Sequence, residues 1–200
     1  MDVSRETSSL LSHYAQLVRK WSPTINLVAP SQIDELEERH IADSLQLADL
    51  IPMRATTIID LGSGGGFPGL VLAIHAAVHH PERNVTLIES DQRKAVFLRT
   101  VVRELDLPAR VICSRIENAE ISPADVVTAR ALAPLTALLS YAKPLLQSDG
   151  TALFPKGEAA EKELADARHA WSFACQEVPS KTRTNARILV IKDIRREPAS

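Results

Sequence analysis

The glycine-rich stretch DLGSGGGFPG, which begins at Asp60, has the residue types and spacing of a nucleotide-binding loop. Its glycines fit two patterns. Gly64, Gly66 and Gly69 form the G-x-G-x-x-G of a dinucleotide site, where backbone N–H groups approach a pyrophosphate. Asp60 followed by glycines at positions 62, 64 and 66 forms the acidic-x-G-x-G-x-G of an S-adenosylmethionine site. The first pattern predicts hydride transfer and the second predicts methyl transfer.

The position of the loop relative to the preceding strand favours the second pattern. In a dinucleotide site the first glycine makes the tight turn directly after the strand. Here the predicted strand ends at about Leu61, so Gly62 takes that place, and the sixth residue counted from it is Phe67 rather than glycine or alanine. Pro68 then removes an N–H donor where a pyrophosphate would bind. Asp60 is expected to fix the loop or to meet a cationic end of the ligand.

Further residues fit a ligand that carries a ribose. Gly62 and Gly64 let the backbone approach a ligand closely, and Phe67 is placed to cover it. Glu89, at the end of the next predicted strand, is expected to meet the ribose hydroxyls. Two alternatives stay open at this point: an NAD(P)-dependent oxidoreductase that uses the Gly64 spacing, and a glycine-rich turn without a ligand.

The methyl acceptor is constrained by what the sequence lacks after its fourth predicted strand. That position contains TARALAPL, without the Asn/Asp-Pro-Pro-aromatic turn that serves exocyclic amines. Cys113 and Cys175 lie elsewhere and are expected to be buried packing residues, not nucleophiles. Methylation of a purine ring nitrogen needs neither this turn nor a nucleophilic cysteine. Arg130 and Lys156, at the ends of the fourth and fifth predicted strands, could hold phosphate or a base edge, or could form surface ion pairs.

Other charged residues suggest where a nucleic acid would bind. His40 lies in ERHIADSL, and we expect a structural role or a substrate contact because no second histidine follows at metal-ligand spacing; no metal site is predicted. The charged residues between positions 34 and 49 are mainly acidic, with six carboxylates against Arg39. A basic C-terminal cluster could bind a phosphate backbone or be an ordinary solvated surface. Its members are Lys181, Arg183, Arg187, Lys192, Arg195 and Arg196.

The elements that position these residues alternate between strands and helices after residue 56. Such alternation predicts a mainly parallel sheet with helices on both faces and a ligand site at the carboxyl ends of the strands. We expect residues 1–55 to form a helical appendage and residues 56–200 one compact domain. Helices are predicted at 4–21, 31–50 (capped by Ser31), 67–78, 91–105, 133–146 and 158–174, and strands at 56–61, 84–90, 109–114, 124–130, 149–157 and 187–194.

Bulk composition fits an ordinary soluble protein. The chain has 200 residues, of which 45% are hydrophobic and 24% charged, and a formal net charge of −2. Two cysteines cannot form a disulfide framework. No signal peptide and no apolar run of membrane-spanning length are recognised. We therefore expect a cytoplasmic protein that does not enter membranes.

Seven motifs, in order, resemble the ribosomal RNA small-subunit methyltransferase G family, also called glucose-inhibited division protein B. They are KW…INL from Lys20, RHIADSL from Arg39, DLGSGGGFPGL, SRIE from Ser114, ARALAPL from Ala129, FPKG from Phe154 and ILVIK from Ile188. The resemblance implies a Rossmann-like class I methyltransferase fold. It also implies S-adenosylmethionine-dependent methylation of N7 of a guanine in small-subunit ribosomal RNA, free or in a ribosomal particle, by a protein we expect to be a monomer.

The resemblance also implies roles for individual residues. Gly62 and Phe67 would line the cofactor, and Ile116 with Glu117 would hold its adenine region. Arg130 would lie beside cofactor and acceptor, and Arg187 is a further basic candidate near the last strand. Guanine N7 carries a free lone pair, so its methylation needs no general base. An alternative from another class is a non-catalytic RNA-binding module, which the intact glycine loop argues against.

Overall fold

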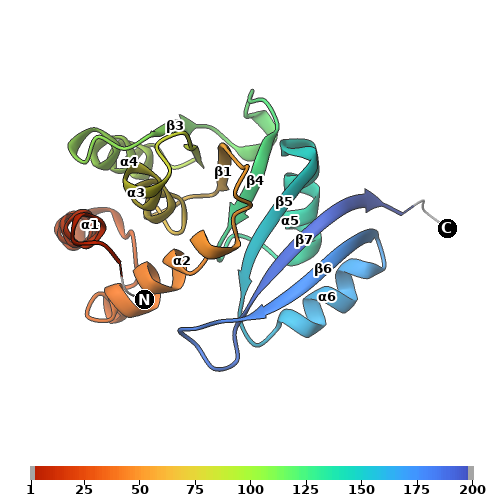
Figure 1. Cartoon of the computed structure of the whole chain (residues 1–200). Coiled ribbons are helices and arrows are strands. Elements are labelled where there is room, and N and C mark those ends of the chain that lie inside the picture. The colour runs from red at the N-terminus through yellow and green to blue at the C-terminus, as the bar shows by residue number, and fades with distance from the viewer. Residues whose placement is uncertain (1–2, 198–200) are drawn as a thin grey trace.

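A single seven-stranded sheet organises the chain, as seen in a computed structural model that describes residues 3–197 (Figure 1). The strand order is β3-β2-β1-β4-β5-β7-β6. The first five strands in this order run parallel, whereas β7 pairs antiparallel with both β5 and β6. The predicted mainly parallel sheet is confirmed. Its strands are β1 (Thr57–Leu61), β2 (Asn84–Glu89), β3 (Ala109–Cys113), β4 (Ala124–Ala129), β5 (Leu146–Lys156), β6 (Trp171–Pro179) and β7 (Arg187–Arg196).

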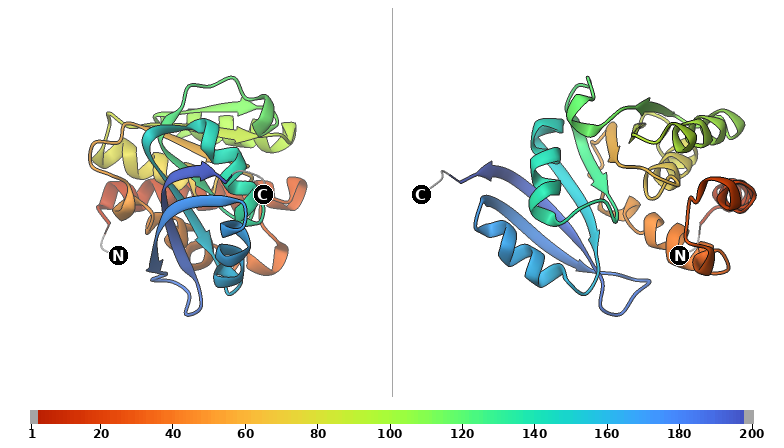
Figure 2. Two further views of the ribbon diagram at one scale, coloured as in Figure 1. Left: turned by 90° about the vertical axis from the view of Figure 1, so that its right-hand side faces the viewer. Right: turned by 180° about the vertical axis from the view of Figure 1, so that it is seen from behind.

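Helices cover both faces of the sheet because successive strand residues alternate between two buried clusters. In β1, Ile58 belongs to the cluster that also contains Tyr14 and Phe97, whereas Ile59 belongs to the cluster with Leu138 and Trp171. Figure 2 shows the two groups of helices on opposite sides. On one side lie α1 (Arg5–Ile25), α3 (Gly69–His79) and α4 (Gln92–Glu104), and on the other α5 (Leu135–Ala142) and α6 (Ala160–Arg168).

The N-terminal segment departs from prediction in two ways. Helix α1 continues to Ile25 with Pro23 inside it, beyond the predicted end at residue 21. The single helix predicted over residues 31–50 is wrong. The chain instead forms η1 (Pro30–Gln32), one π-helical turn η2 (Glu37–Ala42), α2 (Asp43–Leu45) and η3 (Ala48–Leu50), and Ser31 caps no long helix. Side chains of this segment bond to distant parts of the chain, and such tertiary contacts override local helix preference.

The helix predicted over residues 158–174 is also wrong in its second half. Helix α6 ends at Arg168, and β6 begins at Trp171. Trp171 and Phe173 point inward and alternate with exposed Ser172 and Ala174. This period of two is the strand signal that the helical interpretation overlooked. The predicted helix over 133–146 also ends early, because α5 stops at residue 142 and a short 3₁₀ turn, η5 (Lys143–Leu145), leads into β5.

The cysteines are less buried than predicted. Cys113 and Cys175 are both only partly buried, on β3 and β6 respectively. These strands form the two edges of the sheet, where packing covers one face at most. Both remain far from the end of β4, where a cysteine nucleophile was sought.

Candidate functional site

The glycine loop turns directly after β1, as the second glycine pattern requires. β1 ends at Leu61, and Gly62 follows with φ of 60°, a backbone conformation that residues with side chains rarely adopt. A Cβ atom on Gly62 would lie 2.6 Å from Cδ1 of Leu132. The chain therefore needs glycine at this position both for its conformation and for the close approach of a neighbouring group.

Glu89 joins the loop to the following strand and helix. Its carboxylate accepts one hydrogen bond from the Gly64 N–H at 2.7 Å and another from the Asp91 N–H at 2.7 Å. The side chain is nearly buried at the carboxyl end of β2. Glu89 thus holds the two turns that bracket the predicted ligand position, and its contact with ribose hydroxyls stays a prediction.

Asp60 fixes the loop from beneath. Its carboxylate accepts hydrogen bonds from Thr128 Oγ1 at 2.8 Å and from the Gly69 N–H at 3.3 Å. Burial raises the pKa of Asp60 to about 6, while hydrogen bonds from Ser63, Thr128 and Gly69 oppose that rise. The side chain has no exposed surface, so the loop-fixing role is the one that the structure shows.

Phe67 lies under the site. Its ring centroid is 5.4 Å from that of Tyr14 and 5.1 Å from that of His40, and the Arg130 guanidinium lies over it at 5.1 Å. This geometry is that of a cation–π contact. Tyr14 in turn donates a 2.6 Å hydrogen bond to the carbonyl of Gly65, which ties α1 to the glycine loop. Phe67 thus supports the Arg130 guanidinium, and its expected covering of the ligand stays a prediction.

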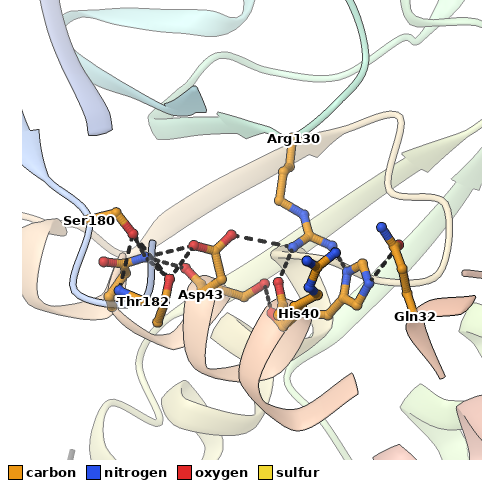
Figure 3. Close-up of polar contacts among 9 residues, drawn as sticks. Gln32, His40, Asp43, Arg130, Ser180 and Thr182 are labelled. Atoms are coloured by element: carbon orange, nitrogen blue, oxygen red, sulfur yellow. Dashed lines mark hydrogen bonds and ion pairs between the residues drawn. The ribbon is translucent and has the colours of Figure 1, made fainter. Parts of the chain in front are cut away.

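Arg130 and His40 form the centre of the site (Figure 3). Arg130 Nη2 donates to His40 Nδ1 at 2.5 Å. An arginine only donates, so His40 Nδ1 carries no proton, and His40 Nε2 then donates to Gln32 Oε1 at 3.1 Å. Burial, together with the positive charge of Arg130, lowers the pKa of His40 to about 4. His40 is therefore neutral, with its lone pair occupied.

Asp43 completes the pairing of Arg130. Arg130 Nη1 donates to Asp43 Oδ2 at 3.4 Å and to the carbonyl of Arg39 at 3.3 Å. Burial lowers the pKa of Arg130, and the nearby carboxylate of Asp43 raises it. The guanidinium is thus a largely buried cation held by a carboxylate, a carbonyl and an imidazole.

Asp43 and Gln46 also connect the N-terminal segment to the loop between β6 and β7. Asp43 Oδ1 accepts from Thr182 Oγ1 at 2.8 Å and from Gln46 Nε2 at 2.9 Å. Gln46 Nε2 also donates to Ser180 Oγ at 3.2 Å, and its Oε1 accepts from the Lys181 N–H at 2.9 Å. Figure 3 shows Ser180 and Thr182 beside Asp43. Residues more than 130 positions apart thus frame one cleft.

Lys156 and Arg187 are occupied by other protein groups. Lys156 Nζ donates to Glu163 Oε2 at 2.7 Å and to the carbonyl of Ala133 at 2.9 Å. Arg187 Nη1 pairs with Glu177 at 2.6 Å and with Glu161 at 3.3 Å. Of the two roles expected for Lys156, the ion pair is the one observed, although the lysine side chain is almost buried rather than on the surface.

Two cavities meet at the segment that follows β4. The smaller, of about 130 Å³, brings together Gly62, Ile116 and Glu117, the last two from the short turn η4 (Ile116–Asn118). The larger is a cleft of about 730 Å³ that brings together the four candidates His40, Arg130, Lys156 and Arg187. Leu132 and Ala133 line both. The segment is therefore the wall between a small pocket and a large cleft.

The lining of the large cleft is mainly basic. Its cationic residues outnumber its carboxylates, which gives it a field suited to a polyanion. The cationic residues are Arg39, Arg130, Lys156, Lys162, Arg183 and Arg187, and the carboxylates are Asp43, Glu163 and Asp166. The basic residues of β7 beyond position 187 do not line it, so the predicted C-terminal cluster is divided.

Sequence reasoning missed Gln32, Gln46, Leu132 and Glu163. Gln46 had a usable signal, because a polar residue between Leu45 and Leu47 interrupts a buried apolar run. Within residues 3–197 no cluster of three or more histidine, cysteine or acidic side chains is arranged to hold a metal ion. In the same range no helix combines the length and apolarity needed to cross a bilayer.

The sheet topology and the loop after β1 define a Rossmann-like class I S-adenosylmethionine-dependent methyltransferase. Similar solved structures are an O-methyltransferase from Bacillus cereus in complex with SAH (TM-score 0.61, 15% identity, 96% of this chain and 93% of that chain) and a SAM-dependent methyltransferase from Aquifex aeolicus (TM-score 0.60, 13% identity, 94% and 99%). These likenesses concern the fold.

Sequence comparison then identifies the family. Residues 7–190 match the family model GidB, rRNA small subunit methyltransferase G. The chain is 51% identical over 194 residues to the ribosomal RNA small subunit methyltransferase G of Gluconobacter oxydans, covering 97% of each chain. It is 52% identical over 192 residues to that of Rhodospirillum centenum, covering 96% of this chain and 87% of the other. The chain belongs to the rRNA small subunit methyltransferase G family, as its motifs predicted.

Proposed function

We propose that this methyltransferase transfers the methyl group of S-adenosylmethionine to N7 of a guanine in small-subunit ribosomal RNA. The observation that carries the proposal is the shared wall of Leu132 and Ala133 between the small pocket and the basic cleft. A methyl donor on one side and a nucleic-acid base on the other would meet at this wall. Family membership supplies the class of RNA.

The residues of the small pocket fit the cofactor. Gly62 leaves the backbone bare at the turn, Ile116 offers an apolar surface for a ring, and Glu117 is an exposed carboxylate that can accept from an exocyclic amine. When bound, S-adenosylmethionine supplies an electrophilic methyl group on a sulfonium. Glu89 would meet the ribose, and Arg130 would lie at the methyl end. Asp60, Gly64 and Phe67 would act on the ligand through the loop that they shape.

The acceptor chemistry agrees with the state of His40. The imidazole on the cleft is neutral, and its lone pair is bound by Arg130, so it is not free to take a proton from a substrate. Guanine N7 attacks with an existing lone pair: the N7–carbon bond forms, the carbon–sulfur bond breaks, and the positive charge passes to the guanine. No proton leaves. Arg130 can donate to guanine O6, which leaves the N7 lone pair available.

The basic cleft supports ribosomal RNA or a ribosomal particle as the partner. Phosphates are attracted by cations such as Lys162 and Arg183 on its rim. Action as a monomer stays a prediction. A substrate of this kind also supports a cytoplasmic location.

A methyl-transfer assay tests the proposal. Purified protein is incubated with labelled S-adenosylmethionine and small-subunit ribosomal RNA or subunits from cells that lack this protein. We expect label at N7 of one guanine, located by digestion and mass mapping. The matched control is RNA from cells that contain the protein, which should accept little label because the site is already methylated. Label on another atom, or none on any RNA or particle, would contradict the proposal.

Calorimetric titration separates the two alternatives. An NAD(P)-dependent oxidoreductase would bind NAD and not S-adenosylmethionine. A non-catalytic RNA-binding module would bind RNA without transferring a methyl group. The turn at Gly62 directly after β1 disfavours the dinucleotide alternative, since the G-x-G-x-x-G spacing starts two residues too late.

A further inference from the structure

The wall between pocket and cleft is held at two places. It comprises residues 130–135, and its first anchor is Arg130, bound to His40 and Asp43. Near its middle, the end of the Leu132 side chain lies 2.6 Å from where a Cβ on Gly62 would be. Ala131 has φ of 52°, which a residue with a side chain adopts only when its surroundings impose it. The wall is thus a constrained segment.

The second anchor is the ion pair of Lys156 and Glu163. Lys156 Nζ donates to the carbonyl of Ala133 at 2.9 Å and to Glu163 Oε2 at 2.7 Å. The same Glu163 oxygen accepts from the Leu135 N–H at 2.7 Å. One ion pair therefore holds the backbone on both sides of Pro134, and the lysine side chain is only 9% exposed.

We propose that Lys156 and Glu163 are positioning residues for methyl transfer, which hold the wall at Ala133 and Leu135 so that cofactor and base meet in line. This inference rests on the proposed function. Neither side chain needs to touch substrate. Because a displacement of about 1 Å between reacting groups can cost roughly 100-fold in rate, a clamp on this segment controls the reaction through geometry.

If Lys156 instead contacts an RNA phosphate directly, the opposite result is expected when Glu163 is replaced. If the ammonium bound RNA, Glu163 would compete with phosphate, and Glu163→Gln would tighten RNA binding. Lys156→Met would then weaken RNA binding and lower the salt dependence of affinity by about one counterion. If the pair is a clamp, both substitutions slow methyl transfer and leave RNA affinity nearly unchanged.

The kinetic test compares Lys156→Met, Glu163→Gln and the double variant with the wild-type protein. Single-turnover methyl transfer is measured at saturating RNA and S-adenosylmethionine, and RNA affinity at two salt concentrations. We expect each single variant to be slower by about tenfold. The double variant should be no slower than the slower single, because two partners in one contact are not additive. Lys156→Arg should recover most of the rate.

A matched control is the exposed ion pair of Arg54 and Asp149, which lies outside both cavities. Arg54→Met and Asp149→Asn should leave the rate unchanged. A wild-type rate in Glu163→Gln, or tighter RNA binding by that variant, would overturn the clamp. If Lys156→Met fails to fold, Glu163→Gln still decides: its amide oxygen can accept from the Leu135 N–H, while the loss of the carboxylate charge weakens the contact with Lys156.

Hydrogen exchange tests the clamp without any acceptor. Loss of the Lys156 contact should speed exchange in residues 130–135 by about tenfold, while the Arg54→Met control should not. Unchanged exchange in Lys156→Met overturns the clamp whatever the substrate is. A wild-type protein that transfers no methyl group to RNA would instead overturn the proposed function, with the exchange result still standing.

Discussion

Arg130 donates to Nδ1 of His40 across 2.5 Å, and Gln32 accepts from the opposite ring nitrogen at 3.1 Å. Both ring nitrogens of the imidazole are therefore used inside the protein. A histidine beside a cleft is usually considered first as a general base. Here it orients an arginine, which suits an acceptor that attacks without losing a proton.

The state of His40 predicts how stability depends on pH. Its pKa in the fold, about 4, lies below the ordinary value of 6.5, so unfolded chains bind more protons between these values. The contribution of His40 to the free energy of unfolding is fully present above about pH 6.5 and is lost as the pH falls toward about 4. His40→Asn should reduce that loss, as measured by denaturant unfolding across the pH range.

Asp60 contributes with the opposite sign in part of the same range. Its pKa is raised from 3.8 to about 6, so the folded state holds the extra proton and stability falls as pH rises between these values. The contribution of His40 is therefore obtained only from the difference in free energy of unfolding between His40→Asn and the wild-type protein. Equal slopes in wild-type and His40→Asn would contradict the prediction.

Replacement of Arg130 should reduce turnover without unfolding the protein. Arg130→Ala removes the guanidinium that lies over Phe67 and faces the cleft, and we expect a loss of about 100-fold in single-turnover rate. Arg130→Lys should recover little, because an ammonium cannot contact His40 and Asp43 with a planar fork. Arg168→Ala, which removes an exposed arginine that stacks on Phe173, is the control. Wild-type turnover in Arg130→Ala would remove this residue from the site.

Substitution of Gly62 should weaken cofactor binding. Gly62→Val places a branched side chain where φ is 60° and where Leu132 Cδ1 lies 2.6 Å from the Cβ position. We expect S-adenosylmethionine affinity to fall by at least about tenfold, with a cost of about 1–2 kcal/mol from the left-handed backbone. Calorimetry and thermal unfolding measure the two effects.

A second substitution separates crowding from backbone strain at the same position. Leu132→Ala, combined with Gly62→Ala, relieves the contact but leaves the left-handed φ. If the double variant binds S-adenosylmethionine more tightly than Gly62→Ala alone, the contact with the Leu132 side chain contributes to the loss of affinity. Unchanged affinity in Gly62→Val would mean that the loop does not bind the cofactor.

Loss of the Tyr14 hydroxyl should destabilise the glycine loop. Tyr14 is fully buried and donates to the Gly65 carbonyl, so Tyr14→Phe leaves a buried carbonyl without this partner. A cost of about 1–3 kcal/mol in the free energy of unfolding is expected, measured in urea. Tyr141→Phe is the matched control because Tyr141 is only partly buried. A change below about 0.5 kcal/mol in Tyr14→Phe would contradict the expectation.

We propose that residues 1–55 fold together with the rest of the chain and not as a separable appendage. Tyr14, Val18 and Leu36 share one buried cluster with Leu70 and Phe97 of the sheet-covering helices. A chain that begins at residue 56 should therefore lack cooperative unfolding in calorimetry. A truncated protein with a sharp thermal transition would show that residues 56–200 are an independent unit.

Local patterns predicted the strands because their signals are short and self-contained. The run TTIIDL is apolar, β-branched and ends at glycine, and it forms β1. The glycine-rich loop after β1 likewise predicted that the site lies at the carboxyl end of the sheet. Prediction failed where distant contacts decide: the segment from residue 31 to 50 is broken so that Asp43 and Gln46 reach the β6–β7 loop. Nothing within ten residues of Gln46 encodes that partner.

The candidate residues were found more readily than their partners. Arg130 and Lys156 were predictable from their places at strand ends, where parallel sheets build sites. Glu163 was not, because one acidic residue in an exposed helix looks like any other until the fold brings it to Lys156. Family resemblance indicated residues that are expected to bind the cofactor, but not the ion pair of Lys156 and Glu163.

The bonds from Asp43 and Gln46 to Ser180 and Thr182 set an order of events during synthesis. The N-terminal side of the cleft emerges from the ribosome well over a hundred residues before the loop that completes it. A chain is made from its N-terminus, and a domain generally folds as a unit. The cleft is therefore unfinished until the loop between β6 and β7 has been made.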